Sequence, residues 1–162
     1  MRDLRTLTQL GLIREHRVSA QEKAVQAALK KVDVSDQALK SAQKTLTEFV
    51  TKLPTMIDAL YLGCINQTVG KEAIEDARQK ELGLLAKKGE YAKHEQDRQE
   101  ELIQSQRELL AAKQQLHIEQ RKYEGLQTLV KDEHKKARQM HERIQNKRLD
   151  EFASSQYACK DM

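Results

Sequence analysis

The residues of this 162-residue chain that could do chemistry are its five histidines, two cysteines and 25 acidic side chains. His134 and His141 lie seven residues apart, on one face of a helix but about 10.5 Å apart along its axis. A zinc ion binds imidazole nitrogen at about 2 Å, so these two side chains cannot share one metal. Cys64 and Cys159 lack a nearby second cysteine of the kind that forms a metal knuckle. We expect no metal site, no cofactor and two incidental thiols.

The sequence also lacks the features that phosphate binding and acid–base catalysis require. The six glycines are scattered, and Gly70-Lys71 is a dipeptide, not a glycine-rich phosphate loop. Carboxylates become catalytic where a pocket excludes water and shifts their pKa values. With 38% hydrophobic and 33% charged residues, the chain has little material for such a pocket. The sequence predicts no catalytic residues, and hence a protein that is not an enzyme.

The elements that must carry these residues are helices. Six glycines and one proline are too few for the turns of a strand-rich fold. The chain has no apolar run near the ~20 residues that span a bilayer, so we expect no membrane insertion. Its first residues do not resemble a secretory signal.

Apolar residues recur every seven positions in both halves of the chain. The first row is Leu4, Gly11, Val18, Val25, Val32, Leu39, Leu46 and Leu53; the second is Leu102, Leu109, Leu116, Tyr123, Val130, Ala137 and Ile144. Such a repeat is typical of a left-handed coiled coil. Arg14, Gln21 and Ser35 are polar positions of the first seam, which we expect to set the register. The fold class is therefore all-α, an elongated antiparallel two-helix coiled-coil hairpin.

Pro54 sets the expected boundaries, because proline disrupts a helix interior but can open a helix. We predict helix 1 at about residues 2–53, a tip with a short helix and loop at 54–70, and a longer helix 2 at about 71–153. A frayed tail follows at 154–162. The whole chain, 1–162, forms one hairpin.

The unequal helix lengths leave the end of helix 2 without a partner beyond about Val130. Ala137, Met140 and Ile144 continue the apolar stripe there. The flanking basic residues are Lys131, Lys135, Lys136, Arg138, Arg143, Lys147 and Arg148. An unpaired helix with this pattern is a docking surface. A frayed end, or pairing with a second copy, is the alternative.

An apolar cluster gathers near the tip. Its members are Phe49, Val50, Leu53, Met56, Ile57, Leu60, Tyr61, Leu62 and Ile65. A cluster larger than the closure of a hairpin requires indicates a binding site, unless the segment folds back and buries itself.

The two ends of the sequence carry a family resemblance. Near the start, Leu7–Leu12 precedes Arg14-Glu15-His16-Arg17 and then Gln21-Glu22-Lys23-Ala24-Val25-Gln26. Near the end come Tyr123-Glu124, Asp132-Glu133, Lys136-Ala137-Arg138-Gln139, Glu142 and Leu149-Asp150-Glu151-Phe152. This pattern resembles the YscO/FliJ stalk proteins of type III secretion, and its closing helix resembles the YscO branch. One departure is Glu48 to Pro54, where YscO-type members often carry an aromatic, Glu-rich stretch.

The resemblance implies a cytoplasmic stalk at the cytoplasmic face of a secretion apparatus. Such a stalk inserts into the hexameric secretion ATPase, promotes its activity, links it to the export-gate protein and binds secretion chaperones. The expected ATPase-binding residues at the open end are Arg5, Arg14, Arg17, Lys131, Lys135, Arg138 and Arg143. The expected gate-binding residues at the tip are Gln43, Leu46, Phe49, Leu53, Ile74 and Arg78.

Two alternatives stand beside this interpretation. A general coiled-coil scaffold or chaperone adaptor would use the same unpaired stripe to hold other helices. A basic helical hairpin can also lie along nucleic acid. Here the basic residues alternate with acidic ones and no aromatic stacking platform accompanies them, so no nucleic-acid partner is expected.

Overall fold

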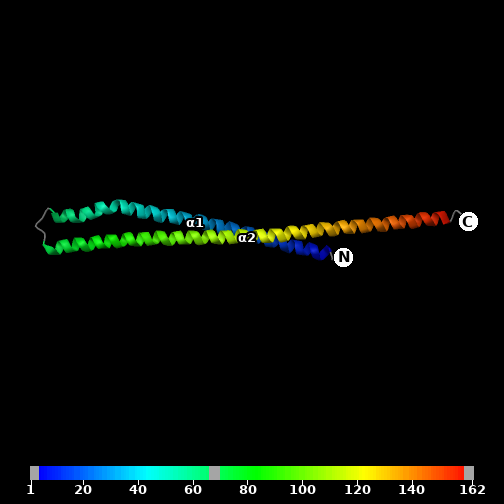
Figure 1. Cartoon of the computed structure of the whole chain (residues 1–162), viewed down its shortest axis with the longest axis horizontal. Helices are drawn as coiled ribbons and strands as arrows, with labels where there is room; N and C mark the ends of the chain where they lie inside the picture. The colour runs from blue at the N-terminus through cyan, green and yellow to red at the C-terminus, as the bar shows by residue number, and fades with distance from the viewer. Residues whose placement is uncertain (1–3, 66–69, 159–162) are drawn as a thin grey trace. The chain divides into compact units, whose positions relative to one another are not determined.

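The computed structural model describes residues 4–65 and 70–158, which form two helices and no strand. Helix α1 is Leu4–Ile65 and helix α2 is Lys71–Ala158. The two helices pack on each other, so the expected all-α helical hairpin is confirmed. The chain divides into two compact units. The hairpin unit is Val25–Ala112, and the terminal unit comprises Met1–Ala24 and Lys113–Met162 (Figure 1).

In the hairpin unit the helices run antiparallel with a fixed register. Ser35 Oγ lies 3.0 Å from Ser105 Oγ, and the ring centroids of Phe49 and Tyr91 are 5.1 Å apart. From Ser35 to Phe49 is a step of 14 residues forward, and from Ser105 to Tyr91 is a step of 14 residues back. Two heptads of α1 therefore face two heptads of α2, as in a coiled coil.

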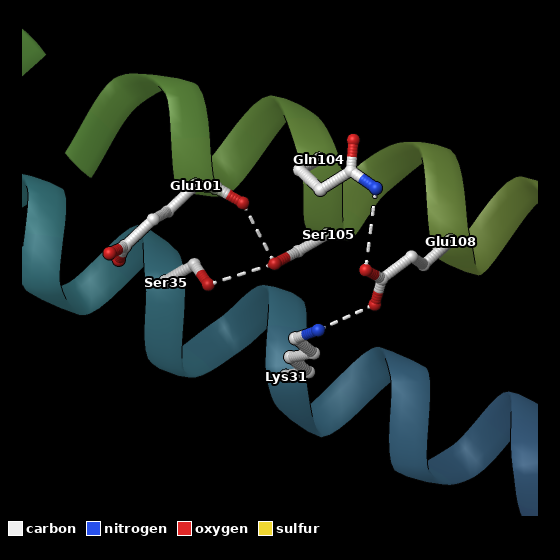
Figure 2. A network of polar contacts seen from close by, with 6 residues as sticks. All are labelled: Lys31, Ser35, Glu101, Gln104, Ser105 and Glu108. Atoms are coloured by element: carbon white, nitrogen blue, oxygen red, sulfur yellow. Dashed lines mark hydrogen bonds and ion pairs between the residues drawn. The ribbon is translucent and has the colours of Figure 1, made fainter. Parts of the chain in front are cut away.

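Burial in the hairpin unit is confined to a narrow seam between the helices. The covered residues of α2 are Ala77, Glu81, Leu84, Tyr91, Glu95, Arg98, Leu102, Ser105, Glu108, Leu109 and Ala112. Most of these residues are spaced alternately by three and four positions, so their side chains form one stripe along α2 that faces α1. Polar contacts cross the seam at Ser35–Ser105 and beside it at Lys31–Glu108 (Figure 2).

Helix α1 continues through Pro54, so the predicted end at residue 53 and the separate tip helix are wrong. Pro54 has no N–H to donate to the Val50 carbonyl, which weakens the helix at this point. Packing on both sides outweighs that loss, because Leu53 is buried and Ile57 is half-buried. Phe49, Leu53 and Ile57 follow one another at steps of four, a local break in the heptad spacing.

The far boundary of α2 also differs from the expectation. The helix extends to Ala158, past the predicted end at residue 153 and into the expected tail. Cys159 and the rest of that tail, like residues 1–3 and 66–69 of the predicted helix start and tip, lie outside the described residues. Within the described part of the chain, neither helix has a stretch that is long and apolar enough to cross a membrane.

Candidate partner-binding surfaces

The seam of the terminal unit contains a buried carboxylate with two cationic partners. Glu119 is 6% exposed, and its Oε2 accepts a hydrogen bond from Arg14 Nη1 at 3.2 Å. Lys122 Nζ donates to the other carboxylate oxygen at 2.8 Å. The hydrogen bond from Lys122 is the main reason that the pKa of Glu119 lies below its ordinary value, and Arg14 acts in the same direction. Leu7, also buried, supplies apolar packing in the same unit.

Arg14 was expected to bind a partner, but the structure places it between α1 and α2. Its side chain is half-buried and paired with Glu119, so it holds the two helices of the terminal unit together. Removing Arg14 would leave a buried carboxylate with one cation fewer, which disfavours the folded state. The other expected residues on α1, Arg5 and Arg17, have exposed side chains.

Three expected basic residues of α2 come together on one face. Lys131, Lys135 and Arg138, with His134, line a shallow open hollow along the helix. Arg143 does not join them, because five residues beyond Arg138 correspond to a rotation of about 140° around the axis. Its side chain is exposed on another face. The basic hollow is therefore formed by three of the four expected residues.

An apolar groove lies between α1 and α2 in the terminal unit, and we call it the terminal groove. Its volume is about 470 Å³, and it is lined by Leu7, Thr8, Gly11, Leu12, Glu15, Tyr123, Leu126, Gln127, Val130 and Lys131. Leu12 on its rim is 59% exposed. A Cβ placed on Gly11 would meet no atom within 4 Å, so the groove has room beside this glycine. Lys131 also belongs to the basic hollow, so the two surfaces are continuous.

The terminal groove was not found from the sequence. The signal was the run from Leu10 to Ile13, where apolar residues occupy positions outside the heptad rows. Leu10, Leu12 and Ile13 are all exposed in the structure. Of these three residues only Leu12 lines the groove, but exposed apolar residues outside the seam of a helix indicate a further contact.

The predicted unpaired end of α2 is present, but it begins later than expected. Glu133 and Ala137 are half-buried, whereas every described residue from Arg138 to Ser154 is exposed. Met140 and Ile144, which continue the apolar stripe, are 55% and 45% exposed. In Figure 1 the red end of α2 extends past the blue start of α1 within this unit.

The expected gate-binding residues divide into two groups in the hairpin unit. Leu53 is buried, and Leu46 and Phe49 are half-buried in the seam, with Phe49 edge-to-face against Tyr91. These residues hold α1 against α2. The exposed members of the set are Gln43, Ile74 and Arg78.

Polar contacts help to close the tip of the hairpin unit. The Tyr61 hydroxyl donates a hydrogen bond to Glu81 Oε2, and this bond raises the pKa of Tyr61. Cys64 is half-buried beside the backbone carbonyls of Leu60 and Ala73. The apolar tip cluster is thus partly buried in the seam, while Val50, Met56, Leu62 and Ile65 remain exposed.

The arrangement is suited to holding helices. The hollows over the described residues are open grooves, and no group of three or more histidine, cysteine or acidic residues in this part of the chain could hold a metal ion. Buried side-chain nitrogen and oxygen atoms within the described ranges all have hydrogen-bond partners.

A family model described as "Type III secretion protein YscO" matches residues 7–155. Searches of curated proteins and of solved structures give no significant match.

Proposed function

Because the chain belongs to the YscO family of type III secretion proteins, we propose that it is a non-enzymatic cytoplasmic stalk of a secretion system. In this role it inserts into the hexameric secretion ATPase, promotes ATP hydrolysis and links the ATPase to the export-gate protein. It needs no cofactor, and secretion chaperones are further partners. It acts at the cytoplasmic face of the apparatus without entering the membrane.

The observation that carries the proposal is the uncovered end of α2. Every residue from Arg138 to Ser154 is exposed, yet Met140 and Ile144 continue the apolar stripe and Arg138, Arg143 and Lys147 flank it. A helix that leaves such a stripe uncovered is built to meet a partner. Basic flanks favour a partner with acidic groups at the contact.

We assign residues to each partner according to the exposure of their side chains. At the ATPase end we retain Arg5, Arg17, Lys131, Lys135, Arg138 and Arg143, all with exposed side chains. Arg14 is assigned to the seam, because it is paired with Glu119. At the gate end the exposed Gln43, Ile74 and Arg78 remain as contacts, and Leu46, Phe49 and Leu53 maintain the hairpin that presents them.

The direct test is ATP hydrolysis by the cognate secretion ATPase, measured with and without this protein at one copy per hexamer. We expect stimulation together with hexamer formation. The double variant Arg138→Glu/Arg143→Glu should abolish both effects, because it replaces two positive charges at the contact with two negative ones and so turns attraction into repulsion.

The matched control is Lys87→Glu/Lys88→Glu, which changes the net charge equally on exposed positions of the hairpin unit. This variant should stimulate the ATPase like the unmodified chain. Stimulation that survives the Arg138/Arg143 change but is lost with Ile74→Glu would reverse the orientation. No binding to the ATPase at all would leave the chain as a coiled-coil adaptor, whose uncovered stripe holds other helices.

A further inference from the structure

We propose that the terminal groove and the adjoining basic hollow together receive an amphipathic helix of a partner protein, with acidic residues toward one end. This inference rests on the proposed function, because it names the kind of segment that the basic end of the stalk binds. The combined surface runs along α2 from Tyr123 to Arg138.

The size of the surface fits a short helix. Tyr123 and Arg138 are 15 residues apart on α2, which at 1.5 Å per residue is about 22 Å. A helix of about 15 residues laid beside α2 would cover that distance. It would enclose the apolar groove wall, which includes Leu12, Leu126 and Val130. Burial of such surface is the main driving force when a helix enters a groove.

The charge along the surface specifies the occupant. Glu15 lies on the wall of the terminal groove, and Lys131, Lys135 and Arg138 lie at the basic hollow. Among the residues that the structure describes, Lys131, Lys135 and Arg138 form no ion pair, whereas the neighbouring Lys136 pairs with Glu133 at 3.0 Å. A complementary helix therefore carries acidic residues where it meets the hollow.

The same charges set the direction of the bound helix. A helix has partial positive charge at its N-terminus and partial negative charge at its C-terminus. The favourable arrangement places the N-terminus near Glu15 and the acidic C-terminal half near Lys131 and Arg138. The bound helix then runs parallel to α2.

Gly11 gives the sharpest test of the groove. A side chain at this position would enter open space, since no atom lies within 4 Å of a Cβ built there. Gly11→Leu should fill the terminal groove and exclude a bound helix while favouring α1 itself. Gly125→Leu is the matched control, because Gly125 is equally open but does not line the groove.

The probe is a synthetic, fluorescein-labelled 18-residue helical peptide with leucines at heptad a and d positions and glutamates in its C-terminal half. Binding to the full chain is measured by fluorescence anisotropy at several salt concentrations. We expect binding that weakens with salt, that falls roughly tenfold with Lys131→Glu/Lys135→Glu, and that is lost with Gly11→Leu. Gly125→Leu and Lys87→Glu/Lys88→Glu should bind as the unmodified chain does.

Two further peptides test the charge and the direction. A peptide with lysine in place of glutamate should not bind, and one with its glutamates in the N-terminal half should bind several-fold more weakly. Equal binding of the glutamate and lysine peptides would overturn the inference, as would binding that Gly11→Leu leaves intact. Equal binding of the two glutamate arrangements would overturn the assigned direction.

Two measurements separate this inference from the proposed function and from self-association. ATPase stimulation without peptide binding would overturn the inference alone, and peptide binding without stimulation would support it while the proposed function fails. Sedimentation of the chain over a range of concentrations is expected to show no dimer that depends on the groove. A dimer that Gly11→Leu abolishes would assign the groove to a second copy instead.

Discussion

Ser35 and Ser105 face each other across the seam of the hairpin unit, with their hydroxyl oxygens 3.0 Å apart. Ser105 Oγ also donates a hydrogen bond to the backbone carbonyl of Glu101 at 2.9 Å (Figure 2). A hydroxyl group has only one proton to donate, so Ser35 is the donor in the hydrogen bond between the two serines. A slip of one heptad would place Ser35 beside Arg98 or Ala112 instead. The pair therefore favours one register among several that the apolar repeat permits.

We predict a measurable coupling between these two serines. Each Ser→Ala change gains helix propensity and loses a hydrogen bond, so the single variants give small net effects. A double-mutant cycle removes the propensity contribution and should give a coupling free energy of about 0.5–1 kcal/mol. Urea unfolding followed by circular dichroism measures it. Strictly additive effects would show that the hydroxyl contact does not stabilise the hairpin.

We predict that acid destabilises the fold partly through Glu119. Its pKa is below the ordinary 4.5 in the folded chain, so the folded state favours the carboxylate. The resulting stability is fully present above about pH 4.5 and is lost as the pH falls through the lower, folded-state pKa. Melting temperatures from pH 7 to pH 3 should fall less steeply for Glu119→Gln than for the unmodified chain.

Glu108 acts in the same direction in the hairpin unit, because its hydrogen bond from Lys31 lowers its pKa. Glu108→Gln should therefore also flatten the decrease of stability in acid, by a smaller amount since the Lys31–Glu108 pair is more exposed than the Arg14–Glu119 pair. An unchanged slope in Glu119→Gln would contradict the role given to the Arg14–Glu119–Lys122 contact.

We predict that Pro54→Ala stabilises the protein by about 1–3 kcal/mol. Alanine restores the N–H that can bond to the Val50 carbonyl and removes the clash of the proline ring. The measurement is the free energy of unfolding in urea. No gain, or a loss, would argue that α1 does not run as one continuous helix through residue 54.

We predict that Gly83→Ala and Gly89→Ala each stabilise the fold by about 0.5–1 kcal/mol. Both glycines lie inside α2, and a Cβ at either would contact no atom within 4 Å. The gain arises from helix propensity alone. The matched control is Ala86→Gly, an exposed position of the same segment, which should destabilise by a similar amount. Thermal unfolding followed by circular dichroism compares the three variants.

We predict that changes at Phe49 and Ile74 separate folding from partner binding. Phe49→Ala removes the contact with Tyr91 and part of the seam, and should cost about 2–3 kcal/mol. Ile74→Glu changes an exposed side chain and should leave the unfolding free energy nearly unchanged while it abolishes binding to the export-gate protein. A pull-down with that protein, beside urea unfolding, tests both. Intact gate binding in Ile74→Glu would exclude this residue from the contact.

The sequence predicted the hairpin and its unpaired end because each depends on the spacing of apolar residues along a single helix. Leu39 and Leu46 mark a seam by their spacing alone, and Met140 and Ile144 continue a stripe past any partner. The family resemblance, confirmed by the match over residues 7–155, likewise depends on local segments. The proline rule failed at residue 54, because packing of Leu53 and Ile57 outweighed a local preference.

Which residues meet across the helices was decided only by the tertiary structure. A heptad pattern repeats every seven residues, so it fixes the face of each helix but not the longitudinal register between them. The register between the helices pairs Arg14 with Glu119, so the Arg14 side chain is not available to bind the partner that the sequence predicted for it. It also brings Gly11 and Val130 to one groove, although 119 residues separate them in the chain. The sequence by itself therefore determined what each helix presents, and the packing of the two helices decided what remains exposed to bind.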